Sequence, residues 1–258
     1  ASSTDGVMDS VYFLDDDRVV KIFETASEEA VAEELKLLTH CGSLRVSRAE
    51  GGVFRVQNKP ALIYRRCRGE SLKSAGTDEI QQIGAFLRGF HHLTAGRRST
   101  NERLFERSRL ERMIRETHTD IFDTIFKKID LTLRDEGIIH GDLFLDNALF
   151  LEGRLSCVID FTQACNGDFL FDLAVADLSW CDSDEKTEAL LKSYGATLTL
   201  DEVRPYREYA TLFYSVNRYL NGGNYQELLE KFVCSKRLPE TKISTRVCGG
   251  SGPVFSCA

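Results

Sequence analysis

Two aspartates and an asparagine, side chains capable of acid–base and metal chemistry, lie within residues 138–174. Asn147 follows Asp142 by five positions, and Asp160 comes at the end of a later apolar run. Kinases transfer a phosphoryl group from ATP with an aspartate that orients the acceptor hydroxyl, followed at this spacing by an asparagine and then by a second aspartate. Oxygen atoms of this kind are the ligands that Mg²⁺ prefers. The stretch therefore predicts Asp142 as the catalytic residue and Asn147 and Asp160 as ligands of Mg²⁺.

A β-hairpin is the element expected to hold these three side chains together. Residues 148–151 and 155–159 are apolar runs of four or five residues, joined by the turn-forming segment Glu152-Gly153-Arg154. Short apolar runs on either side of a glycine-containing turn are typical of a hairpin. The predicted hairpin places both carboxylates and the amide near its ends. Taken singly, each of the three could be an ordinary turn or capping residue.

The order of the motifs in this stretch resembles a known family. The segments HGDLFLDN (140–147), VIDF (158–161) and FDLA (171–174) are followed by Trp180-Cys181. This order resembles the aminoglycoside phosphotransferase and choline kinase superfamily, and it is most similar to bacterial homoserine kinase of that fold. The resemblance implies an ATP- and Mg²⁺-dependent enzyme that phosphorylates an alcohol group of a small molecule. L-Homoserine is the first substrate to expect, with choline, ethanolamine or an aminoglycoside as the alternatives.

The resemblance also implies a fold and a division of the chain. We expect an α+β, bilobal, protein-kinase-like fold with a small antiparallel N-lobe and a mostly helical C-lobe. The N-lobe would comprise residues 1–66 and the C-lobe residues 67–234. Residues 235–258 lose helical periodicity and collect Gly, Ser and Pro, so they are expected to form a poorly ordered tail.

A lysine and a glutamate near the N-terminus are candidates for holding the phosphates of ATP. Lys21 is flanked by apolar β-forming residues in a predicted hairpin over residues 10–23, where a kinase carries its ATP lysine. Residues 27–39 predict a helix, and a kinase uses a helix glutamate to hold that lysine. Glu34 is the first choice and Glu33 the alternate. A solvent-facing lysine and a solvated acidic helix face are the simpler interpretations.

Three more nucleotide-binding candidates follow from the resemblance. Residues 6–10 resemble the nucleotide loop of the superfamily, which makes Ser10 a candidate. Residues 65–72 resemble the linker between lobes, where family members hold adenine through main-chain atoms, so Arg66 and Cys67 are candidates there. The basic residues of this segment could instead form an anion-binding patch.

The remaining chain is predicted to be mainly helical. Asp172 lies in an apolar stretch and must find partners, because an unpaired buried carboxylate is costly. The resemblance implies that it braces the catalytic loop, and His140 is expected to be structural rather than a proton carrier. Apolar periodicity predicts one or two helices within residues 102–133 and single helices over residues 77–94, 184–194, 200–221 and 225–234.

Composition limits the class of protein. The 258 residues are 42% hydrophobic and 28% charged, with a net charge of −7, which disfavours a nucleic-acid or anionic-membrane surface. No apolar run reaches the ~18–20 residues of a membrane span, and the first residues do not read as a signal peptide. The eight cysteines form no C-x-x-C pair. We therefore expect a cytoplasmic monomer or weak homodimer with reduced cysteines.

Two other functions are compatible with parts of this pattern. A non-catalytic ATP-binding module would keep the fold without turnover, and the single glycine of the N-terminal loop favours it. A protein kinase is disfavoured by Gly141, where such enzymes carry Arg, and by Thr162, where they carry the Gly of DFG.

Overall fold

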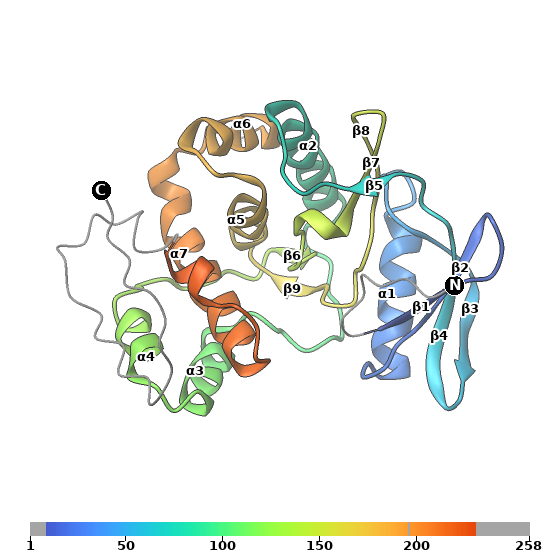
Figure 1. Ribbon diagram of the computed structural model, residues 1–258, viewed down its shortest axis with the longest axis horizontal. Coiled ribbons are helices and arrows are strands. Elements are labelled where there is room, and N and C mark those ends of the chain that lie inside the picture. Colours follow the sequence, from blue (N-terminus) through green and yellow to red (C-terminus); the bar gives the residue numbers. More distant parts are fainter. Residues whose placement is uncertain (1–8, 196, 231–258) are drawn as a thin grey trace, which may run out of the picture.

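The N-terminal part of the chain is an antiparallel sheet covered by one helix. The computed structural model describes residues 9–195 and 197–230. The sheet has the strand order β1-β2-β4-β3, and it lies with α1 at one end of the molecule (Figure 1). Its elements are β1 (Ser10–Phe13), β2 (Arg18–Ile22), α1 (Glu28–His40), β3 (Arg48–Val56) and β4 (Lys59–Arg65).

Helix α1 begins where the sequence predicts. The Ser27 hydroxyl accepts a hydrogen bond from the Ala30 amide at 3.2 Å, and two glutamates in the first turn favour the positive end of the helix dipole. The helix buries Val31, Leu37 and Leu38, which belong to the continuous core of the molecule. Glu34 is buried on the same helix, whereas Glu28 and Glu29 are exposed.

Helices and short strands make up the rest of the molecule. The helices gather at the end opposite the first sheet (Figure 1). They are α2 (Thr77–Thr94), α3 (Arg107–Glu116), α4 (Asp120–Phe126), α5 (Phe169–Trp180), α6 (Asp184–Tyr194) and α7 (Leu200–Leu220). The strands are β5 (Glu70–Ser71), β6 (Gly137–Ile139), β7 (Ala148–Leu151), β8 (Arg154–Val158) and β9 (Cys165–Gly167), with a 3₁₀ turn at η1 (Leu145–Asn147).

The predicted catalytic hairpin is formed by β7 and β8. These strands pair antiparallel, from Ala148 opposite Val158 to Leu151 opposite Arg154, and β5 joins the other edge of β7. Strand β6, just before the catalytic loop, pairs with β9. The short β9 was not predicted, because three residues carry too little periodicity to stand out. The predicted catalytic loop, residues 140–147, therefore lies between two small sheets.

Helix α5 forms the centre of the helical part. It is mostly apolar and has buried residues on all sides, as expected for a helix surrounded by protein, and it contacts α2, α6 and α7 (Figure 1). Its fully buried side chains include Phe171, Leu173 and Leu178. Within the described residues, no helix is long and apolar enough to cross a membrane.

Most element boundaries agree with the sequence. The predicted helices over residues 77–94 and 184–194 match α2 and α6, and the segment 102–133 contains two helices. Strand β3 continues through Gly51 and Gly52, with a register shift against β4 between Glu50 and Phe54. The last predicted helix is seen only as residues 226–230, and the tail over residues 235–258 lies outside the described residues. The division of the chain at residue 66 stays a prediction.

The expectation that all cysteines are reduced is wrong for one pair. Cys67 and Cys157 form a disulfide across a sequence separation of 90 residues. No local pattern indicated this pairing, because only the fold brings the segment after β4 beside β8. Cys41, Cys165 and Cys181 are free and buried.

The contact between α2 and α6 depends on a glycine. A Cβ at Gly84 would lie 2.6 Å from the Leu190 carbonyl oxygen and 2.0 Å from the Ser193 hydroxyl. We expect Gly84→Ala to lower the free energy of unfolding by about 1–3 kcal/mol, because the helices must move apart. Gly89→Ala is the matched control in the same helix, since its Cβ meets only a flexible Leu44 methyl at 3.2 Å. Urea unfolding should show the control unchanged or more stable by up to about 1 kcal/mol. Equal effects of both substitutions would contradict the close helix contact.

Candidate active site

Asp142 lies at the centre of a hydrogen-bonded loop. The Asn147 side-chain amide donates to the backbone carbonyl oxygen of Asp142 at 2.7 Å and to the carboxylate Oδ2 of Asp142 at 3.3 Å. The Gln163 amide donates to the same Oδ2 at 3.3 Å. Burial, together with the charges of Asp160 and Asp146, raises the pKa of Asp142 to about 8. The carboxylate is thus oriented by two amides and is more basic than an ordinary aspartate.

Asn147 and Asp160, the predicted metal ligands, are held next to each other by the backbone. The Ile159 amide donates to the Asn147 carbonyl oxygen at 3.0 Å, and Asp160 follows directly with a φ of +60°. This left-handed conformation is uncommon outside glycine, although aspartate adopts it more readily than most residues. The turn directs the chain away from β8 immediately after Ile159.

The two residues have free oxygens of the kind that Mg²⁺ prefers. Asp160 Oδ1 accepts from Lys21 and Thr162, and within the described residues its Oδ2 has no hydrogen-bond donor. Asn147 uses its side-chain nitrogen toward Asp142 and keeps its Oδ1 available. The described residues contain no cluster of three or more His, Cys, Asp or Glu side chains suited to a metal. One carboxylate and one amide fit Mg²⁺ that takes its other ligands from phosphate and water.

Lys21 joins the same cluster from β2. Its Nζ lies 2.8 Å from Asp160 Oδ1, 3.0 Å from Asp9 Oδ2 and 2.7 Å from the Thr162 hydroxyl. Burial alone would lower the pKa of Lys21, but the carboxylates of Asp160, Glu34 and Asp9 raise it. Conversely, the pKa of Asp160, which burial would raise, is held below its usual value by Lys21. The structure thus brings the predicted lysine to the predicted metal aspartate across 139 residues.

Glu34 lies behind this cluster. Its Oε1 accepts from the Tyr64 hydroxyl at 2.7 Å, and its Oε2 accepts from the Thr162 hydroxyl at 3.4 Å. Burial raises the pKa of Glu34, against the opposing charge of Lys21. Thr162 therefore connects Glu34 to Lys21, and in this structure the direct ion pairs of the lysine are to Asp9 and Asp160. The alternate, Glu33, instead binds Lys36 at 2.7 Å.

A buried carboxylate braces the catalytic loop, as predicted. Asp172 accepts hydrogen bonds from the backbone amides of His140 at 2.9 Å and Gly141 at 2.7 Å, and from His91 at 2.9 Å. Burial would raise the pKa of Asp172, but the hydrogen bond and charge of His91 outweigh it and keep the pKa below its usual value. One ionised side chain on α5 thus fixes the backbone that leads into Asp142.

His140 has a structural role, as predicted. Burial lowers its pKa, so the ring is neutral. The Asp142 amide donates to Nδ1 at 3.2 Å, and Nε2 lies 3.1 Å from the Ile159 carbonyl oxygen. Because Nδ1 accepts, the proton must be on Nε2, where it donates to Ile159. The ring therefore connects the catalytic loop to the residue just before Asp160.

Gly141, which differs from the Arg of protein kinases, is required by its surroundings. Its φ is +78°, and a Cβ would lie 2.3 Å from the Phe105 ring. That ring is buried and packs against the rings of Phe171 and Phe213. A side chain at residue 141 would therefore clash with the core.

Gly141→Ala is expected to lower the free energy of unfolding by about 2–5 kcal/mol, from the left-handed backbone and the clash with Phe105. Gly96→Ala is the matched control, because Gly96 has a φ of +70° and nothing within 4 Å of its Cβ position. Urea unfolding of both variants separates the backbone cost from the clash. Equal losses in the two variants would show that Phe105 does not exclude a side chain.

The three other residues predicted to bind the nucleotide have partners outside the cluster of Lys21, Asp142, Asn147 and Asp160. The Ser10 hydroxyl donates to Glu24 at 2.6 Å. The Arg66 amide donates to the Asp17 carbonyl oxygen at 2.7 Å, and its guanidinium lies over the Phe13 ring at 4.8 Å. Cys67 is bonded to Cys157. Their roles toward a nucleotide stay predictions.

Sequence reasoning missed four residues of the site. Thr162 and Gln163 come two and three positions after Asp160, with Phe161 between, and their polarity after an apolar strand was a usable signal. Asp9 precedes the first strand and Tyr64 lies within an apolar run, so neither stood out before the fold placed it beside Lys21 or Glu34.

Comparison with known proteins gives a consistent family and fold. The model of the phosphotransferase enzyme family (APH) matches residues 4–209. Homoserine kinase of Bartonella henselae is 30% identical over 161 residues, covering 57% of this chain and 50% of that protein. Homoserine kinase of Methylobacillus flagellatus is 26% identical over 219 residues, covering 77% of this chain and 65% of that protein. The chain thus spans between half and two thirds of the length of these relatives.

Two solved structures have the same fold. The GDP complex of an aminoglycoside 2′-phosphotransferase IIIa variant superposes with a TM-score of 0.66 at 17% identity, covering 92% of this chain and 90% of that one. Choline kinase LicA from Streptococcus pneumoniae superposes with a TM-score of 0.66 at 15% identity, covering 90% and 92%. The α+β, kinase-like fold expected from the sequence is confirmed.

Proposed function

The chain belongs to the phosphotransferase enzyme family, and on that premise we propose that it transfers the γ-phosphoryl group of ATP, with Mg²⁺, to a hydroxyl group of a small molecule. The observation that carries this proposal is that Lys21, from the first sheet, meets three polar side chains grouped within residues 142–160. Asp142, Asn147, Asp160 and Lys21 are linked through hydrogen bonds in one cluster. This is the set that phosphoryl transfer uses for positioning and charge neutralisation.

Asp142 orients the acceptor hydroxyl and accepts its proton. A carboxylate with a raised pKa is a stronger proton acceptor in its ionised form, which suits a general base near neutral pH. The amides of Asn147 and Gln163 hold its Oδ2, so that the carboxylate is oriented before the acceptor binds.

Lys21 holds the phosphates of the nucleotide, and Asn147 and Asp160 hold the metal. When bound, Mg²⁺ neutralises phosphate charge and favours in-line transfer. Lys21 is protonated throughout the neutral range, because three carboxylates raise its pKa. Its contacts with Asp160 and Thr162 fix its position, with Glu34 supporting Thr162 from behind.

L-Homoserine is the acceptor that the comparisons favour. The relatives matched by sequence carry the name homoserine kinase. The structural neighbours carry the names aminoglycoside phosphotransferase and choline kinase, which keeps aminoglycosides and choline as the second choice.

An acceptor panel tests this proposal. ADP release with Mg·ATP should be measured against L-homoserine, serine, threonine, choline, ethanolamine and an aminoglycoside. We expect turnover that depends on both Mg²⁺ and one acceptor, highest with L-homoserine. Turnover with a different alcohol would replace the homoserine assignment and keep the kinase. Tight Mg·ATP binding with no turnover on any acceptor would favour a non-catalytic ATP-binding module.

A further inference from the structure

The disulfide between Cys67 and Cys157 lies beside the active-site cluster and has no role in the proposed reaction. We propose that these two cysteines are a thiol–disulfide switch that sets the mobility of the segment connecting β4 to β5. The expected effect on nucleotide release rests on the proposed function, whereas the effect on segment mobility does not.

Cys67 lies where the first sheet joins the rest of the chain. It is the second residue after β4, and the preceding Arg66 amide donates to the Asp17 carbonyl oxygen in the β1–β2 turn. Three residues later the chain enters β5, which pairs with β7. Movement of the first sheet relative to the helical part must therefore change the backbone around Cys67.

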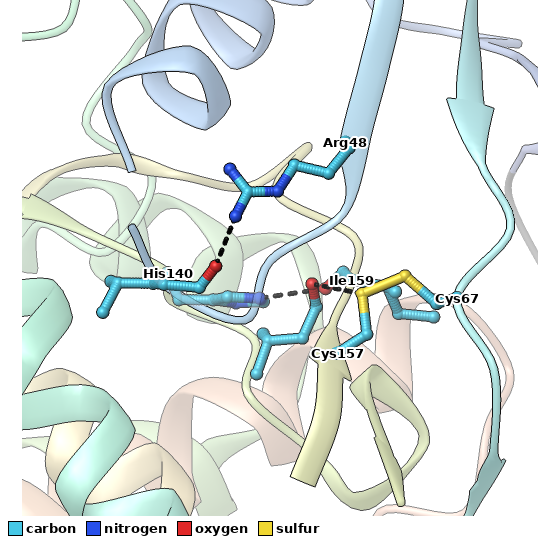
Figure 2. The surroundings of a disulfide bond; sticks show 7 residues. Arg48, Cys67, His140, Cys157 and Ile159 are labelled. Carbon is cyan, nitrogen blue, oxygen red and sulfur yellow. Dashed lines mark hydrogen bonds between the residues drawn. A yellow bond between two sulfur atoms is a disulfide. The ribbon is translucent and has the colours of Figure 1, made fainter. Parts of the chain in front are cut away.

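Cys157 lies on the strand that leads to the predicted metal aspartate. It faces Leu149 in the β7–β8 pairing and is only three residues before Asp160. Ile159, between them, bonds to Asn147 through its amide and to His140 through its carbonyl oxygen. Figure 2 shows the disulfide close to this His140–Ile159 contact. The disulfide thus links the segment between β4 and β5 covalently to the strand that ends just before Asp160.

The same strand meets the first part of the chain at a second point. The Val158 amide donates to the Arg45 carbonyl oxygen at 2.7 Å, and the Ser47 amide donates to the Val158 carbonyl oxygen at 3.0 Å. These backbone bonds can open and close, whereas a covalent bond cannot. Reduction of the disulfide leaves the junction held by reversible contacts, so that the connecting segment gains freedom.

The two sulfurs differ in a way that permits controlled reduction. Cys67 is partly exposed, whereas Cys157 is 3% exposed. The thiolate of a low-molecular-weight dithiol attacks the Cys67 sulfur, and Cys157 leaves as a thiolate and takes up a proton. The second thiol of the reductant then attacks the reductant's other sulfur, the one bonded to Cys67 in the mixed disulfide, and Cys67 leaves as a thiolate. Two electrons pass from the dithiol, which becomes a cyclic disulfide, and a low-molecular-weight disulfide reverses the reaction.

The other described cysteines are poor competitors for this chemistry. Burial raises the pKa of Cys41 to about 11 and that of Cys165 to about 12, and burial also raises the pKa of Cys181. Such thiols carry almost no thiolate near neutral pH and react slowly. Within the described residues, the redox response is therefore confined to Cys67 and Cys157.

Hydrogen exchange and nucleotide release test the switch together. Peptide mapping of the oxidised, full-length protein should first recover the Cys67–Cys157 cross-link. On adding dithiothreitol, we expect amide exchange over residues 65–71 to accelerate on the order of tenfold, as for a segment released to open locally. Release of a fluorescent ATP analogue with Mg²⁺ should accelerate in parallel.

Cys67→Ser is the control variant, because residue 67 is partly exposed and serine is nearly isosteric with cysteine. In both oxidant and reductant, its amide exchange over residues 65–71 and its release of the ATP analogue should match those of the reduced protein. A redox effect on either rate that persists in this variant comes from other cysteines. Absence of the cross-link, or identical exchange over residues 65–71 in both redox states, would overturn the switch. If exchange responds but the analogue binds in neither state, the switch stands and the proposed nucleotide function fails.

Discussion

Replacing Asp142 by asparagine is expected to lower kcat for phosphoryl transfer by about 10²–10⁴-fold, the contribution of a positioned general base. Asparagine keeps the shape of the side chain but cannot accept the proton of the acceptor hydroxyl. The hydrogen bonds that shape the loop go to the Asp142 backbone as well as to its carboxylate, so the fold should survive. ADP release at saturating acceptor and Mg·ATP measures the loss.

Asp146→Asn is the matched control for this substitution. Asp146 lies four positions further along the same loop and is exposed. Its charge acts on Asp142 only from a distance, so we expect kcat to change no more than a few-fold. Mg·ATP affinity of Asp142→Asn should stay close to that of the unmodified protein. A kcat equal to that of the control would exclude Asp142 as the catalytic base.

Asp172→Ala is expected to give the largest loss of stability, about 3–5 kcal/mol in the free energy of unfolding. The substitution removes the acceptor for the His140 and Gly141 amides and leaves His91 without its carboxylate partner. All of these groups are buried, so water does not readily replace the lost hydrogen bonds. Urea unfolding at neutral pH measures the loss, and exposed Asp130→Ala serves as the control, with a change within about 0.5 kcal/mol.

The effect of Asp172 should also depend on pH in a defined direction. The folded-state pKa of Asp172 lies below its usual value, so ionised Asp172 contributes stability above the unfolded pKa of about 3.9. That contribution is lost as the pH falls through the folded-state pKa. The difference between the unmodified protein and Asp172→Ala should therefore shrink below about pH 4. A constant difference from pH 7 to pH 3 would show that the charge of Asp172 is not what stabilises the loop.

The local parts of the site could be predicted because their spacing is encoded locally. Asp142 and Asn147 are separated by one loop, and Asp160 by one further hairpin, so that short apolar runs and a turn were enough to place them together. Asp172 could be expected to have buried partners because a lone carboxylate in the apolar stretch at the start of α5 is costly, and the family resemblance assigned it as a brace.

The parts of the site that join distant segments could not be derived in this way. Lys21 was identified through the family resemblance, and its partner Asp9 and the Glu34–Tyr64 contact appear only once the first sheet is folded. The disulfide depends on the packing of the connecting segment against β8, which no local pattern encodes.

Gly141 shows how a sequence difference can be explained only by packing. In the sequence, Gly141 stands where protein kinases carry Arg, which argues against a protein kinase, but the sequence does not explain why glycine is needed there. In the structure the Phe105 ring occupies the space where a side chain would begin. The Tyr209 hydroxyl donates a hydrogen bond to the Phe105 carbonyl oxygen at 2.8 Å and so helps to hold Phe105 in place. The position of this ring is what requires glycine at residue 141.

The most direct test of phosphoryl transfer is ³¹P NMR of the protein with L-homoserine, ATP and Mg²⁺. We expect a phosphate monoester signal to grow at the same rate as the signals of ADP, and Asp142→Asn to slow the growth of both by about 10²–10⁴-fold. If the mixture yields ADP and inorganic phosphate without an ester, or no ADP with any acceptor despite bound Mg·ATP, the chain does not transfer phosphate to a hydroxyl group.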